Sequence, residues 1–109
     1  MTRYAVAACQ TEMPNPVDRA GMRANTDRML EMIDAAVGGS APFIPVRLVV
    51  FPEFAHAAPI YATVAELRDK LAVPIPNEHT DRLVARARAG GLYVQSGSLI
   101  ESDPEWPDV

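Results

Sequence analysis

The chain has 109 residues, a hydrophobic fraction of 49% and a formal net charge of -4 at pH 7. These values fit one small soluble domain with a single core. The acidic balance argues against a nucleic-acid or anionic-membrane surface, so we expect neither partner. The only cysteine, Cys9, cannot form an internal disulfide, and no targeting segment is visible. We therefore predict a cytoplasmic protein.

Two apolar runs flank an amphipathic segment in the first half of the chain. Residues 4–9 are small or apolar and predict a strand, which the following prolines end. From Met22 to Val37 apolar residues recur every three or four positions, which predicts a helix that stops at Gly38-Gly39. Residues 48–51 predict a strand buried on both faces, as in a parallel sheet covered by helices. Strand, helix and strand in this order predict a right-handed βαβ unit and an α/β fold.

The second half adds two helices and a strand. Thr63 and Glu66 have the spacing of a capping box for a short helix that ends by Val73. Asn77 can cap a further helix, closed by Gly90-Gly91. Residues 92–100 predict the third strand. A sheet this small has open edges and a face short of cover, so we expect the chain to be the first part of a longer domain.

Glu53 is the candidate catalytic residue, because it follows Pro52 at the end of the second apolar run. Proline cannot donate to a strand ladder, so Glu53 should lie just past the strand's carboxyl end, where open α/β sheets keep their binding crevices. We expect the adjacent dry strand to desolvate this carboxylate partly, which makes it a better proton acceptor. The alternative is an acid at a helix start or in a surface ion pair.

These segments together resemble a known family. Their order is similar to that of the N-terminal part of the nitrilase superfamily of carbon-nitrogen hydrolases. The matching pieces are Tyr-Ala-Val-Ala-Ala-Cys-Gln at 4–10, Val-Val-Phe-Pro-Glu at 49–53, Ile-Pro at 75–76, Gly-Leu-Tyr-Val at 91–94 and Gly-Ser at 97–98. The most specific piece is Phe-Pro-Glu after an apolar strand. The resemblance implies that residues 1–109 are the N-terminal part of a single hydrolase domain with an α-β-β-α sandwich, incomplete in this chain.

The resemblance also implies hydrolysis of non-peptide carbon-nitrogen bonds by a Glu-Lys-Cys triad without a cofactor. Glu53 matches the triad glutamate, whereas neither Lys70 nor Cys9 matches a triad position, so we expect the chain alone to be inactive. Short amides are favoured because residues 73–78 look similar to the corresponding segment of aliphatic amidases. Nitriles and N-carbamoyl amines remain alternative substrates. Family members usually form dimers or larger assemblies, so the resemblance implies a homo-oligomer.

The loop after Glu53 supplies two candidates for substrate binding, Phe54 and Tyr61, although an aromatic beside a strand end is more often packing. Cys9 is expected to be an inert core residue. His56 and His79 lack a third ligand at metal spacing, so we predict no metal site and ordinary hydrogen-bonded roles for both.

The remaining charged and glycine-rich features bear on rival functions. Arg82, Arg86 and Arg88 are expected to form a solvated helix face. A non-catalytic α/β assembly module, or a degenerate superfamily member, is the rival to the enzyme. A nucleotide-binding domain lacks support, because no predicted strand is followed by a G-x-G-x-x-G turn or a G-x-x-x-x-G-K-[ST] loop.

Overall fold

The computed structural model describes residues 2–107, which form a three-stranded parallel sheet and three helices. The sheet order is β1-β2-β3, with β2 in the middle. The predicted α/β class is confirmed. In chain order the elements are β1 (Ala5–Ala8), α1 (Met22–Ser40), β2 (Val46–Val50), α2 (Val64–Lys70), α3 (Glu78–Gly90) and β3 (Tyr93–Gln95).

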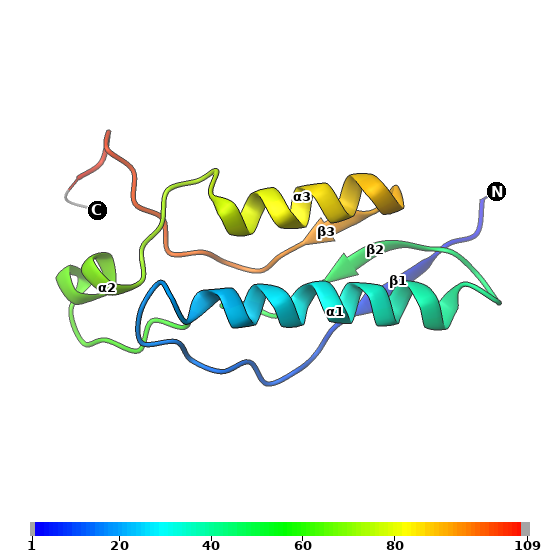
Figure 1. Ribbon diagram of the computed structural model, residues 1–109, viewed down its shortest axis with the longest axis horizontal. Helices are drawn as coiled ribbons and strands as arrows, with labels where there is room; N and C mark the ends of the chain where they lie inside the picture. Colours follow the sequence, from blue (N-terminus) through cyan, green and yellow to red (C-terminus); the bar gives the residue numbers. More distant parts are fainter. Residues whose placement is uncertain (1, 108–109) are drawn as a thin grey trace.

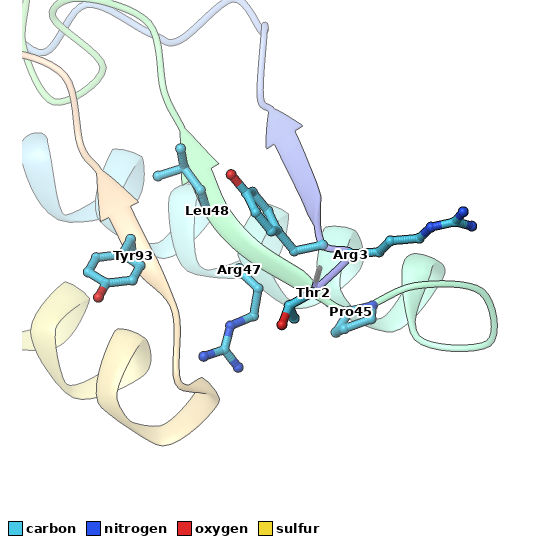
Figure 2. A pocket seen from close by; sticks show the side chains of 7 residues that line it. Thr2, Arg3, Pro45, Arg47, Leu48 and Tyr93 are labelled. Atoms are coloured by element: carbon cyan, nitrogen blue, oxygen red, sulfur yellow. The ribbon is translucent and has the colours of Figure 1, made fainter.

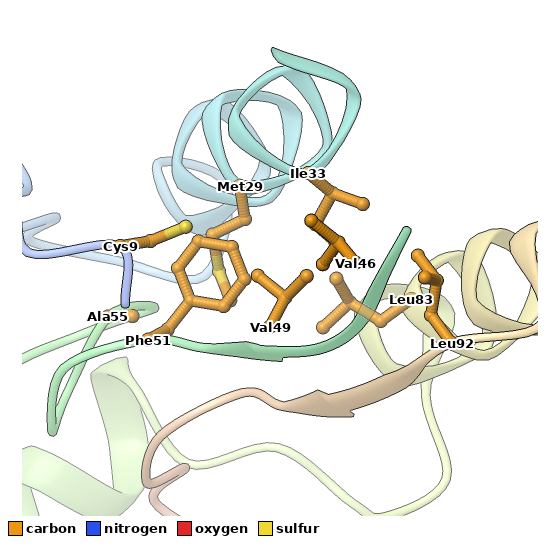
Figure 3. Packing of buried hydrophobic residues seen from close by; sticks show 9 residues of the cluster. All are labelled: Cys9, Met29, Ile33, Val46, Val49, Phe51, Ala55, Leu83 and Leu92. Carbon is orange, nitrogen blue, oxygen red and sulfur yellow. The ribbon is translucent and has the colours of Figure 1, made fainter. Parts of the chain in front are cut away.

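Both long helices, α1 and α3, lie side by side on one face of the sheet, and α2 lies beyond the carboxyl ends of the strands (Figure 1). The main core fills the space between these helices and the sheet, as Figure 3 shows. The buried members of this core are Cys9, Met29, Ile33, Val46, Val49, Phe51, Ala55, Leu83 and Leu92. On the opposite face Leu48 is only half-buried and Arg47 is exposed. The predicted burial of residues 48–51 on both faces is therefore wrong for the described residues.

Local signals account for both ends of α3. Asn77 caps α3 because its side-chain oxygen accepts hydrogen bonds from the backbone N–H groups of His79 and Thr80. Gly91 closes α3 in the left-handed region, with φ of 59°. Both predictions are confirmed. The expected stop of α1 at Gly38-Gly39 is wrong, since the helix continues to Ser40. Glycine inside a helix costs only about 1 kcal/mol relative to alanine, which is not enough to end it.

Ion pairs join the outer sides of α1 and α3. Arg86 donates from Nε to Asp34 over 2.6 Å, and one turn earlier Arg82 donates from Nη2 to Asp27. Both arginines are half-buried, and each is held in an ion pair with α1. The prediction of a solvated face is wrong for these two residues. Arg88 is exposed, as expected.

The third strand is shorter than predicted. It ends at Gln95, and the chain then leaves the sheet toward α2, where Val73 and Glu101 form an isolated parallel bridge. A second, smaller core lies beside α2 and contains Met22, Ala57, Leu71 and Val73. Within residues 2–107 no helix is long and apolar enough to cross a membrane.

Candidate active site

Backbone hydrogen bonds join the carboxyl ends of the three strands. The backbone N–H of Cys9 donates to the Val50 carbonyl over 2.8 Å, and that of Phe51 donates to the Gln95 carbonyl over 2.9 Å. Directly after Phe51 the chain leaves β2, so Glu53 lies past the carboxyl end of the central strand. Its side chain is exposed. The expected partial desolvation of this carboxylate is therefore wrong for the described residues.

The turn that carries Glu53 has an unusual backbone. Phe54 has φ of 55°, in the left-handed region that bulky side chains rarely adopt. Such strain persists only where the surroundings hold the backbone, and it gathers at functional sites. Gly97 supplies part of that hold: an added Cβ there would lie 2.2 Å from the Pro52 carbonyl oxygen. In the sequence Gly97 is part of the Gly-Ser piece of the family resemblance, and nothing there indicates its contact with Pro52.

The two predicted substrate-binding aromatics lie in different surroundings. Phe54 is half-buried next to Glu53. Tyr61 packs against the second core, and its hydroxyl donates to the Val17 carbonyl. A hollow of about 280 Å³ at the same sheet edge is lined by Ala8, Cys9, Gln10, Val50, Phe51 and Pro52. Neither aromatic is among these lining residues, so the structure gives Tyr61 a packing contact and leaves substrate binding by either as a prediction.

Cys9 and Lys70 do not complete a triad with Glu53. Cys9 is 8% exposed and belongs to the main core, where burial raises the pKa of its thiol. A thiol in these surroundings stays protonated near neutral pH and is a poor nucleophile. Lys70 ends α2 and lies 3.4 Å from the carboxylate of its neighbour Asp69. Among residues 2–107 no three His, Cys, Asp or Glu side chains are placed to hold a metal ion.

The sheet face opposite the helices carries large apolar side chains, as Figure 2 shows around Leu48 and Tyr93. The strand register puts Val6, Leu48 and Tyr93 in one row across the sheet, and Tyr4 precedes Val6 by two residues on the same face. We call these four residues the open face. Tyr4 is 58% exposed and Tyr93 is 74% exposed. Tyr4, Val6 and Tyr93 therefore form an exposed apolar row across this face of the sheet.

A hollow of about 700 Å³ lies at the amino end of the open face. Tyr4, Leu48 and Tyr93 line it, and Arg3 and Arg47 stand at its rim. It lies at the opposite end of the strands from Glu53, since parallel strands share one polarity. This hollow and the candidate base are therefore separate features of the sheet.

No protein-family model and no curated protein sequence matches this chain. The choice of function consequently depends on the residues themselves and on the geometry of the Glu53 turn.

Proposed function

We propose that this chain supplies the general base of a cofactor-free hydrolase that cleaves non-peptide carbon-nitrogen bonds, with short amides as the favoured substrates. The observation that carries the proposal is the strained turn that presents Glu53 at the carboxyl end of the central parallel strand. Open α/β sheets keep their ligand sites at this edge. The Phe-Pro-Glu sequence at this turn is the most specific part of the resemblance to the nitrilase superfamily.

The chemistry requires partners that this chain does not bring to Glu53. A cysteine thiol adds to the amide carbonyl carbon as Glu53 takes its proton, and a lysine ammonium stabilises the oxyanion. The carbon-nitrogen bond then breaks, Glu53 returns the proton to the departing ammonia, and water hydrolyses the thioester. Cys9 is a core thiol and Lys70 lies on α2. We propose that a separate cysteine and lysine, outside this chain, complete the triad.

The proposal also includes a fold, in which this chain is the N-terminal part of an α-β-β-α sandwich. In an α-β-β-α sandwich a second sheet covers the face of the first that carries no helix. The open face at Tyr4, Val6, Leu48 and Tyr93 supports this arrangement, because its apolar side chains lack cover. A covering layer that reached the carboxyl ends of the strands would also exclude water from Glu53. The protein would be cytoplasmic and form a homo-oligomer.

Ammonia release tests the proposal. The natural gene product, with any sequence that adjoins this chain, is assayed with acetamide, formamide, a short nitrile and an N-carbamoyl amine. We expect activity on an amide, and a loss of about 10²–10⁴-fold in Glu53→Gln, the usual contribution of a general base. Glu31→Gln is the matched control, since Glu31 is also an exposed glutamate and lies on α1. Undiminished activity in Glu53→Gln, or no ammonia from any substrate, would refute the proposal.

The 109-residue chain assayed by itself provides a second test. We expect no ammonia release from acetamide or formamide, because the thiol nucleophile is missing. Turnover by this chain that disappears in Glu53→Gln would overturn the assignment of the other triad members to separate sequence.

The second candidate function is a non-catalytic assembly module. The exposed apolar row of the open face and the exposure of Glu53 favour it. In that case Tyr93→Lys should disrupt assembly measured by sedimentation, while Glu53→Gln changes neither assembly nor any amide hydrolysis. A hydrolase instead loses turnover in Glu53→Gln.

A further inference from the structure

The two histidines of the chain form a buried pair. His56, in the loop after Glu53, is 0% exposed, and His79, in the first turn of α3, is 3% exposed. Their ring centroids lie 5.6 Å apart with the planes tilted by 54°. No other histidine occurs in the sequence. Any imidazole titration of this protein therefore belongs to the pair.

The hydrogen bonding of the pair is incomplete. His79 Nδ1 lies 2.8 Å from the Thr26 hydroxyl on α1. Both ring nitrogens of His56 lack a hydrogen-bond partner among the described residues. A buried polar side chain without partners costs about 1–3 kcal/mol and calls for an explanation. The expectation of an ordinary hydrogen-bonded histidine is wrong for His56 and holds for His79.

The surroundings favour the neutral form of both rings. Burial, and to a smaller extent the neighbouring His79, lowers the pKa of His56 to about 4. Burial also lowers the pKa of His79. The charged groups that act on His79 are Glu78 and Arg82 from α3 and Arg23 and Asp27 from α1, with the two carboxylates opposing the two arginines. Both rings are therefore neutral near pH 7, and a ring that moves into water takes up a proton more readily than a buried one.

The segment that carries His56 is anchored to α1 directly after the Glu53 turn. The His56 carbonyl accepts a hydrogen bond of 2.8 Å from the buried Asn25 side chain on α1, which also donates to the Pro14 carbonyl. Ala55 and Ala57, on either side of His56, are buried. The turn at Glu53 precedes this anchored segment directly. Movement of the whole His56 residue into water would break this anchor beside the turn that positions the carboxylate.

We infer that the His56–His79 pair is a proton-operated latch on the turn that carries Glu53. The latch is closed when both rings are neutral and opens when the pair takes up a proton. Regulation of hydrolysis by this latch rests on the proposed function of Glu53. The opening of the latch in acid does not depend on that function. The device makes the candidate site sensitive to acid between pH 7 and pH 5, above the ordinary pKa range of carboxylates.

Amide hydrogen exchange tests the latch in the 109-residue chain. The pKa of His56 is about 4 when the latch is closed and 6.5 when the ring is in water. The protection factors of residues 53–57 should therefore fall by about 30-fold from pH 7.5 to pH 5. These factors are corrected for intrinsic exchange, and residues 29–33 of α1 should stay protected, which separates local opening from unfolding. His56→Leu should lose most of the pH dependence. Glu53→Gln should keep it.

Proton NMR titration of the two imidazoles is a second measurement that needs no variant. We expect the His56 ring line to titrate well below pH 6.5. A midpoint at or above 6.5, or equal protection of residues 53–57 at both pH values, would overturn the latch. Exchange is measured without substrate, so the latch and the hydrolase assignment can fail independently: loss of ammonia release in Glu53→Gln reports only on the latter.

Discussion

Replacing Gly97 by alanine should destabilise the protein, and the structure gives the reason. Gly97 has φ of 80°, and an added Cβ would lie 2.2 Å from the Pro52 carbonyl oxygen and 3.2 Å from the carbonyl carbon. The left-handed backbone costs alanine about 1–2 kcal/mol. Overpacking adds about 1–3 kcal/mol, because the contact is with backbone and cannot be relieved by a side-chain rotation. We expect a loss of ~3 kcal/mol in the free energy of unfolding.

The matched control is Gly38→Ala. Gly38 lies inside α1, and an added Cβ there would meet nothing within 4 Å. The same chemical change should stabilise the protein at this position, by about 0.5–1 kcal/mol, because alanine has the better helix propensity. Comparison of the two variants therefore separates the effects of the left-handed backbone and the Pro52 contact at residue 97 from the general effect of replacing a glycine.

Urea denaturation followed by circular dichroism measures both variants. The midpoint should fall for Gly97→Ala and rise slightly for Gly38→Ala, with similar slopes. Equal stability of Gly97→Ala and the wild type would refute the close approach of residue 97 to the Pro52–Ala55 turn. That result would also remove the support that we ascribe to the backbone at Glu53.

Three further outcomes follow from single residues. The free energy of unfolding should drop by ~2 kcal/mol from pH 7.5 to pH 5 in urea titrations. The lowered pKa of His56, about 4 when folded, gives stability that is full above pH 6.5 and lost as pH falls. A pH-independent value would contradict this sign. Asn77→Ala should cost ~1 kcal/mol by removing the α3 cap, and an unchanged melting curve would count against it. Cys9 should react slowly with a thiol reagent unless urea is added, because it is buried and its pKa is raised.

Elements set by their own residues could be predicted closely from the sequence. α3 begins at the Asn77 cap and ends at the left-handed Gly91, as expected, since both signals act within a few residues. The buried face of α1 follows its apolar period, with Met22, Met29 and Ile33 inside. The Thr63 cap of α2 likewise accepts a hydrogen bond from the Glu66 N–H.

Features that depend on distant segments could not be predicted. Arg82 and Arg86 were expected in water because nothing in α3 shows that α1 places Asp27 and Asp34 opposite them. The third strand is shorter than predicted because the chain turns toward α2 after Gln95. There Glu101 forms a bridge with Val73, which is 28 residues away in the chain and gives no local signal. Burial of His56 had no signal either, since its loop has no hydrophobic period.

The candidate site combines a firm frame with a movable segment. The frame is the hydrogen-bonded edge at Cys9, Phe51 and Gln95, which fixes where the chain leaves the sheet. The movable segment is the turn after it, which depends on the Asn25 hydrogen bond and on a neutral His56. A base must be positioned to within hydrogen-bond reach of its proton, so opening of the segment should lower turnover before it affects the fold. We therefore expect acid to inactivate a hydrolase built on this frame at a pH where the main core remains folded.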